Sequence, residues 1–283
     1  MNAVLNGVGR SPSSQSADGF LRIGVPIGRG GTGGQLSDAV EAITHLAERA
    51  PAAALQMWAQ RVLIECLLHG DNVGLCEYQL TSVLDGTVPG TTGLWRQTLS
   101  LRDREAARVT GRNTHRGWRL SGRLAAMPNV GPAWYVAAIP VAFEESRAYA
   151  IALLSSEQDR IRRIDAVGPP GSHGANIATL ELDDVHFRED ELIAPDGPKL
   201  VGQIRTVSVA LRCGMLVGQA RTLMQQHPEL YRPSHAAHLS RLVDQLLTGV
   251  SAGSFTRSPF ELLAIHLQLV RHGARRVGAL TRH

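Results

Sequence analysis

Apolar and polar positions change their periodicity twice along the chain, which divides it into three parts. Between Gln35 and about Leu84, apolar residues recur at the spacing of one helical face. Within this part, the run "AAALQMWAQRVLIECLLHG" is apolar on nearly every side until Gly70. A helix of that kind is usually buried, so we expect it in the middle of a bundle.

From about Thr91 to Ile193 the pattern changes to short segments rich in β-forming residues, separated by Gly, Pro, Asn or charged turns. Four of them are "GWRLSGRL", "AWYVAAIPVA", "RAYAIALLSS" and "ATLELDDVHF". The last alternates most clearly, with Leu180, Leu182 and Val185 on one face. These segments predict an antiparallel sheet or a small barrel.

The helical period returns after Pro195. One helix is marked by apolar residues from Ile204 to Leu216 and another by those from Leu239 to Leu247. A third begins at "SPFE", where Ser258 and Glu261 form a capping box. We therefore predict an α+β fold with four parts: a flexible lead at 1–19, an N-terminal helical domain at 20–90, a central β domain at 91–197 and a C-terminal helical domain at 198–283.

Composition narrows the function classes. The 283 residues are 43% hydrophobic and 19% charged, with a formal net charge of +4, which is ordinary for a globular protein. No apolar run reaches membrane-spanning length and no secretory signal is present, so we expect a cytoplasmic protein with no membrane partner. Arginines are spread along the chain rather than gathered in a stripe, so no nucleic-acid partner is expected. Cys66, Cys76 and Cys213 have no metal-ligand spacing and are interpreted as buried reduced thiols.

Four glycines lie within five positions in "GVPIGRGGTGGQLSDAVEAITHLA", residues 24–47. A phosphate-binding loop needs Lys and Ser or Thr after its last glycine, and here Gly34 is followed by Gln35. A dinucleotide fingerprint needs alternating strands and helices around it, and none follow. We therefore interpret the glycines as a positive-φ bend that leads the chain into a helix.

Three segments together resemble the acyl-CoA dehydrogenase superfamily. The family's first domain carries a VP…GG.G…D…E..A segment, matched here by Val25, Pro26, Gly30, Gly31, Gly33, Asp38 and Ala47. "GWRLSGRL" is similar to its strand ending in Leu-Asn/Ser-Gly, and "ATLELDDVHFREDELI" to its strand with paired acids, here Asp183 and Asp184. "LRCGMLVGQARTLM" resembles the start of its C-terminal helical domain. The resemblance implies a β-barrel between helical domains, a dimeric or tetrameric assembly, FAD, and oxidation of acyl thioesters.

The chain departs from the family pattern at several flavin contacts. The family carries a threonine-glutamate and then a glycine-serine-aspartate run before its Leu-Asn-Gly strand, and Thr98 and Ser100 are the hydroxyls here that could take the place of that threonine. At the aromatic-Ile-Thr triplet that lies against the flavin ring, this sequence has Ala126, Met127 and Pro128, with Asn129 as a substitute polar partner. The family's first helices and its final segment have no counterpart, so we expect a shortened member. Arg205 matches an arginine on the first C-terminal helix, and Ile204 stands where one branch has its catalytic glutamate.

The catalytic base is therefore not identified. Dehydrogenation needs a carboxylate for the α-proton while hydride leaves for the flavin. The candidates that remain are Asp244, Glu229 and His173, whereas Glu261 is explained by its capping box. His235 and His238 are three residues apart, but the sequence places no third ligand beside them, so no metal site is expected.

The first hypothesis is a flavin-dependent oxidoreductase that binds FAD and acts on an acyl-CoA or acyl-carrier thioester as a homo-oligomer. The alternative is a flavin-free relative that binds an acyl thioester or pairs with a full-length homologue in a hetero-oligomer. A non-redox enzyme on the same scaffold also stays open.

Overall fold

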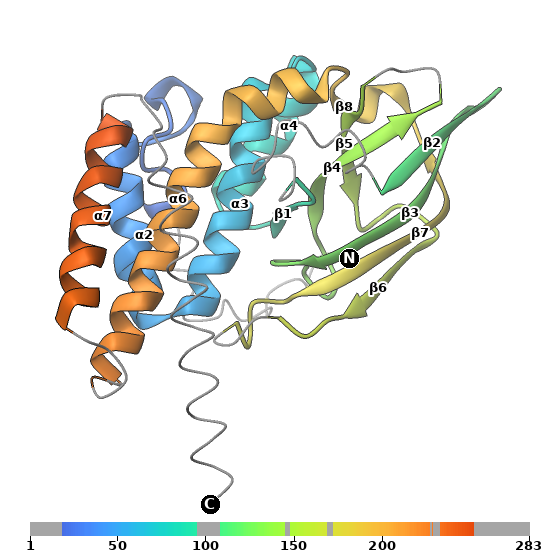
Figure 1. The fold of residues 1–283 in the computed structure, drawn as a ribbon. Coiled ribbons are helices and arrows are strands. Elements are labelled where there is room, and N and C mark those ends of the chain that lie inside the picture. The colour runs from blue at the N-terminus through green and yellow to red at the C-terminus, as the bar shows by residue number, and fades with distance from the viewer. Residues whose placement is uncertain are drawn as a thin grey trace, which may run out of the picture.

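The computed structural model describes residues 19–94, 108–144, 148–168, 172–226, 228 and 233–251. Its helices are the short 3₁₀ turn η1 (Ile27–Arg29), α2 (Leu36–Arg49), α3 (Pro51–His69), α4 (Val73–Leu84), η3 (Glu189–Glu191), α6 (Gly197–Gln226) and α7 (Pro233–Ser251). The strands are β1 (Gly90–Thr92), β2 (Val109–Thr114), β3 (Gly117–Met127), β4 (Val136–Phe143), β5 (Ala150–Ser155), β6 (Ile161–Asp165), β7 (Ala178–Phe187) and β8 (Leu192–Ala194). The order of helices, strands and helices agrees with the periodicity, and the α+β class is confirmed (Figure 1). The domain boundaries stay predictions, and the helix expected at Ser258 lies outside the described residues.

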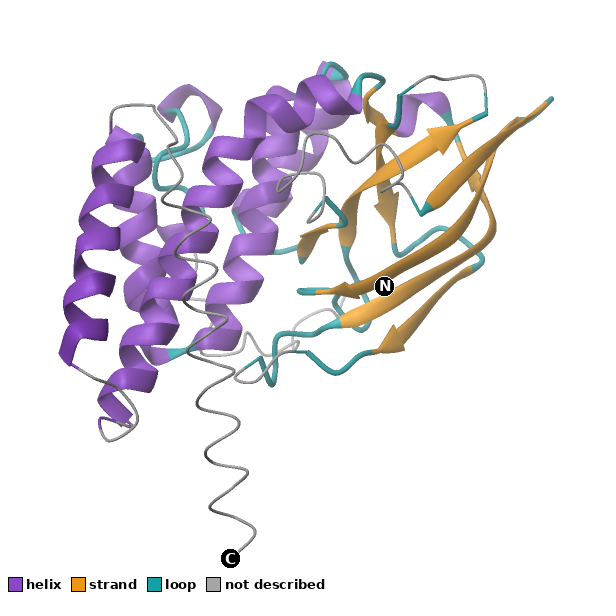
Figure 2. Cartoon of the chain, in the orientation of Figure 1, coloured by secondary structure: helices purple, strands orange, loops and turns teal. Residues whose placement is uncertain are grey.

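The described helices pack together in a bundle on one side of the sheet (Figure 2). Helix α6 packs against both α2 and α3. Close approach explains this packing, because a Cβ added at Gly218 would lie 2.2 Å from the carbonyl oxygen of Thr44 on α2. Helix α3 is buried along most of its length, as its all-round apolar pattern predicts.

The sheet is mixed, whereas the sequence predicted an antiparallel one. Its strand order is β6-β7-β3-β2-β4-β5-β8, and β1 joins β4 off this path. Most neighbours are antiparallel, but β4 pairs in parallel with both β1 and β2. Alternation of apolar residues reports which face of a strand is buried, and it carries no information about the direction of the neighbouring strand.

Two cores result from this arrangement. Strands β2, β3, β4, β5 and β7 enclose one apolar cluster, which includes Leu120, Ile139 and Phe187. The opposite face of β4 and β5 presents Val136, Ala138, Ile151 and Leu153 to the helices in a larger cluster. Strands β4 and β5 are thus buried on both faces, which explains their nearly continuous apolar sequence.

One helix, α6, is long and apolar enough to cross a membrane by length and composition, but 67% of its most apolar window is buried inside the protein. The core helix of a folded domain passes the same test, so the helix indicates no membrane span. The three cysteines are buried and free, as expected. Burial raises the pKa of Cys76 to about 11 and that of Cys213 to about 12, and it raises the pKa of Cys66 as well.

The glycine-rich segment is a backbone corner, as the sequence predicted. Gly24, Gly30, Gly33 and Gly34 all have positive φ. The amide of Gly24 donates to the carbonyl of Gly33, and the amide of Gly33 donates to the carbonyl of Val25, at 2.7 and 2.9 Å. Because these amides bond within the corner, they do not form a phosphate cradle.

A buried ion pair fixes this corner to α3. The guanidinium of Arg61 lies 2.8 Å from the Glu65 carboxylate one turn on, and both side chains are almost fully buried. Arg61 also donates to the carbonyl of Ile23, at the start of the corner. The charged pair explains how two ionic residues are accommodated in a helix that the sequence predicts to be buried.

Candidate functional site

The end of β3 meets the helical layer at the positions where the resemblance places the flavin ring. We call residues 126–129, together with Gln60, Gly90 and Thr91, the β3 junction. The pairing of β3 with β7 shifts register between Leu124 and Met127. Ala126 and Asn129 have φ of 53° and 59°, so the chain turns sharply at both ends of the junction. Asparagine tolerates this left-handed conformation better than most residues.

Two amide side chains hold the junction together. Asn129 Nδ2 donates to Gln60 Oε1 and to the carbonyl of Gly90, each at 2.9 Å. Gln60 Oε1 also accepts from the amide of Gly90 at 3.2 Å, and its Nε2 donates to the carbonyls of Val83 and Val88. Both side chains are buried. The network therefore joins α3, β1 and the end of β3.

The loop that carries His173 adjoins the same junction. The amide of Asn129 donates to the carbonyl of Ala175, and Gln56 on α3 donates from its side chain to the carbonyl of Gly174. The structure thus brings Met127, Asn129 and the His173 loop together. The His173 side chain itself is exposed, and no described contact points it into the junction.

The junction has fewer free hydrogen-bond donors than the resemblance implies for residues that contact a flavin ring. Ala126 is small and exposed, and the side chain of Met127 is buried in the sheet core. Pro128 has neither a hydroxyl nor a backbone N–H, and its carbonyl already accepts from the hydroxyl of Thr91. Asn129 donates both of its side-chain hydrogens within the junction and has no third to offer. The remaining flavin candidates, Thr98 and Ser100, lie outside the described residues.

A second polar group lies along one face of α6, where Arg205, Ser208 and Arg212 follow at helical spacing. Trp58 of α3 donates from its indole to the carbonyl of Ser208 at 2.9 Å, and the guanidinium of Arg212 lies 5.4 Å from the centre of the Trp58 ring. Burial lowers the pKa of Arg212 to about 9. Ile204 stands where one branch of the resembled family has its catalytic glutamate, and it is fully buried in the apolar core.

Two of the three proposed bases, His173 and Asp244, lie within the described residues, and both are exposed. Asp244 lies on α7, and Glu229 lies outside the described residues. The part of α7 that is described places His238 on the surface beside Arg241. Among the described residues, no group of three His, Cys, Asp or Glu side chains could hold a metal ion.

Sequence reasoning missed Gln60, the residue on which the junction depends. It lies inside an apolar run, next to Arg61, and a polar residue at a buried helical position needs a partner. That signal could have marked Gln60 as part of a network. Its partner Asn129, 69 residues away, could not be inferred from the pattern.

Comparison with known proteins identifies the fold. No family model and no curated protein matches the sequence. Solved structures do match. They include butyryl-CoA dehydrogenase from Megasphaera elsdenii, with TM-score 0.69, 15% identity, and 91% of this chain and 76% of that chain covered. A glutaryl-CoA dehydrogenase in complex with glutaryl-CoA matches with TM-score 0.72, 14% identity, and coverage of 91% and 75%. PigA with FAD and proline matches with TM-score 0.72, 12% identity, and coverage of 92% and 76%.

The chain has the acyl-CoA dehydrogenase fold. It is a divergent example, because its identity to these structures is 12–15%. The resemblance read from the glycine corner, from β3 and from the paired acids of β7 is confirmed at the level of the fold.

Proposed function

We propose that the protein binds an acyl thioester on an acyl-CoA dehydrogenase scaffold and does not hold a flavin ring at the end of β3. The observation that carries this proposal is the network of Gln60 and Asn129, whose side-chain amide donors all bond within the protein. A flavin ring edge needs hydrogen-bond partners, and in this chain the carbonyl of Pro128 and the donors of Asn129 bond to the protein itself.

Support for the thioester comes from the structural neighbours. One of them is a glutaryl-CoA complex and another is a butyryl-CoA dehydrogenase. The face of α6 with Arg205, Ser208 and Arg212 supplies the positive charge that a phosphate-bearing thioester needs. Without a carboxylate base among the described residues of this face, bound thioester would be held rather than oxidised.

Calorimetric titration and an absorbance spectrum of the purified protein test the two halves of the proposal. We expect calorimetry to show binding of butyryl-CoA, and we expect the protein to stay colourless after incubation with excess FAD and removal of the unbound cofactor. Arg205→Gln should weaken butyryl-CoA binding, whereas Arg241→Gln, on the exposed surface of α7, should not. Stoichiometric binding of FAD would contradict the flavin-free half, and absence of binding by butyryl-CoA would contradict the other.

A second candidate is a flavin-dependent oxidoreductase acting on an acyl thioester. It is favoured by the FAD-bound neighbour PigA, and it would require Thr98 and Ser100 to hold the cofactor. It predicts a yellow protein whose flavin absorbance bleaches when butyryl-CoA is added, with the product desaturated between the α- and β-carbons. A colourless protein that gains no absorbance with FAD excludes it.

Both candidates include self-association, and the flavin-free one includes pairing with a full-length relative that supplies the flavin and the base. Light scattering of the protein alone, and again after co-expression with such a relative, distinguishes a homo-oligomer from a hetero-oligomer. A monomer under both conditions would contradict the assembly.

A further inference from the structure

The outer face of β2, β3, β6 and β7 carries a dense group of arginines. We call Arg112 on β2, Arg119 and Arg123 on β3, Arg162 on β6, and Arg160 just before β6 the arginine face. It lies opposite the apolar cluster of the sheet, and no described helix covers it (Figure 2). Neither the glycine corner nor the β3 junction uses these residues.

Strand register places like charges directly beside one another on this face. Arg112 is the cross-strand partner of Arg119, and Arg119 is in turn the partner of His186 on β7. Paired strands are only about 4.7–4.9 Å apart, and like charges directly opposite are destabilising. Three neighbouring basic side chains in one row therefore go against the preference for opposite charges on paired strands. Departures of this kind from the rules of stability are expected at functional surfaces.

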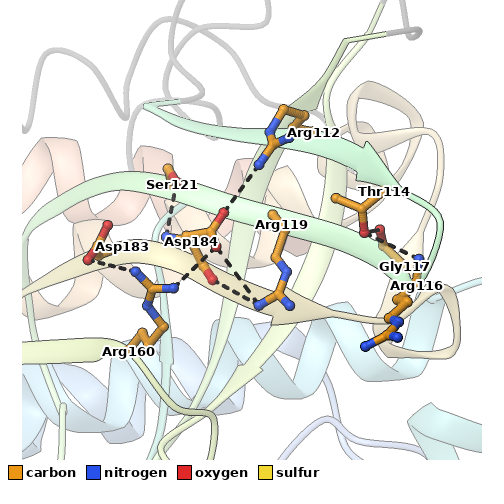
Figure 3. A network of polar contacts seen from close by, with 9 residues as sticks. All are labelled: Arg112, Thr114, Arg116, Gly117, Arg119, Ser121, Arg160, Asp183 and Asp184. Carbon is orange, nitrogen blue, oxygen red and sulfur yellow. Dashed lines mark hydrogen bonds and ion pairs between the residues drawn. The ribbon is translucent and has the colours of Figure 1, made fainter.

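A β-bulge holds a carboxylate beneath this row. Ser121 of β3 faces two residues of β7, Asp183 and Asp184, where the register shifts. Asp184 has a φ of 59°, and its amide donates to the hydroxyl of Ser121 at 3.1 Å. As Figure 3 shows, its carboxylate faces three guanidiniums, those of Arg112 at 3.5 Å, Arg119 at 4.0 Å and Arg160 at 3.2 Å. The bulge thus orients the arginines without balancing their charge.

The charge count leaves an excess of positive charge. The five arginines of the face contact three carboxylates, those of Glu181, Asp183 and Asp184, which leaves an excess of two positive charges before His186 is counted. Most of these side chains are half or more exposed, and exposed ion pairs contribute only about 0–1 kcal/mol each. Stability therefore does not explain the arrangement.

We propose that the arginine face is a docking surface for a protein rich in surface carboxylates. The face belongs to an open sheet and spreads over four strands, so it suits an extended partner better than a small anion. The face is of mixed sign, because the exposed carboxylate of Asp183 pairs with Arg160 and those of Asp184 and Glu181 lie among the other arginines. A protein surface that carries both signs complements such a face better than a continuous phosphate backbone does.

Fluorescence anisotropy with a labelled, glutamate-rich helical peptide containing one central lysine tests the proposal on the full chain. We expect measurable binding that weakens as salt is raised, because the contacts are exposed charges. The double variant Arg112→Glu/Arg119→Glu should weaken peptide binding about tenfold or more. The matched control Arg49→Glu/Arg241→Glu changes the net charge equally on exposed helical positions and should change binding less than about twofold.

A milder pair, Arg112→Gln/Arg119→Gln, separates docking from folding. It should also weaken peptide binding while leaving the unfolding midpoint unchanged or higher, because it removes a like-charge pair. Equal losses in the face variant and the control variant would overturn the proposal. Tighter binding of a 20-base-pair DNA duplex or of pyrophosphate than of the peptide, lost with the same arginines, would overturn it as well.

Discussion

Asn129 allows the β3 junction to be tested with a nearly isosteric change. Asn129→Asp keeps the size of the side chain and its tolerance for a φ of 59°, but it replaces the donating amide with an accepting oxygen. That oxygen would face Gln60 Oε1 and the carbonyl of Gly90, each 2.9 Å from the present nitrogen. Burial without donors should raise the pKa of the new carboxyl group above its usual value.

The magnitude follows from the lost contacts. Two lost hydrogen bonds cost about 1 kcal/mol each. Each unit by which the carboxyl pKa rises costs a further ~1.4 kcal/mol at a pH above that pKa. We expect Asn129→Asp to lower the free energy of unfolding by about 3 kcal/mol at pH 7. In acid, the protonated carboxyl group can donate one bond again, which should reduce the loss to about 1 kcal/mol.

The sign of the pH dependence is fixed by the raised pKa in the folded state. Relative to the wild type, stability is retained below the unfolded pKa and is lost as pH rises through the folded pKa. Urea unfolding between pH 4 and pH 8 measures the difference. Asn176→Asp is the control, because Asn176 also has positive φ, at 48°, but is exposed. A loss below about 1 kcal/mol at pH 7, or one equal to that of the control, would refute the reasoning.

Three further predictions concern the corner, the buried ion pair and the thiols. Gly31→Ala would place a Cβ 2.0 Å from a carbonyl oxygen and should lower unfolding stability by about 2 kcal/mol or more, whereas Gly28→Ala, with nothing within 4 Å, should not. Glu65→Gln leaves Arg61 buried without its counter-charge and should cost about 3–5 kcal/mol in urea unfolding, unlike an exposed glutamate. Because burial raises the pKa of Cys213 to about 12, its contribution to stability is present below the unfolded pKa of 9.0 and is lost as pH rises toward 12. Cys213→Ala should flatten that alkaline decline, and an unchanged slope would contradict it.

The sequence alone determined the order and type of the main elements. The strand predicted from "ATLELDDVHF" coincides with β7, and the helical spacing before Leu84 and after Pro195 became α2–α4 and α6–α7. The glycine corner was also predictable. Its glycines match no phosphate-binding motif, so the remaining explanation for their clustering is a backbone with positive φ, which the structure has. Periodicity and turn residues act locally, so they can be read without knowing the neighbours.

Only the tertiary structure decided what those elements bring together. The parallel pairing of β4, the packing of the described helices on one side of the sheet and the hydrogen bond from Asn129 to Gln60 depend on how distant segments dock. The bond between these two residues joins positions 69 apart. Together with the bond to the carbonyl of Gly90, it occupies both side-chain hydrogens of Asn129, the residue that the resemblance assigned to the flavin ring. Apolar spacing records which side of an element is buried, but the partner across the interface is set by packing of whole layers.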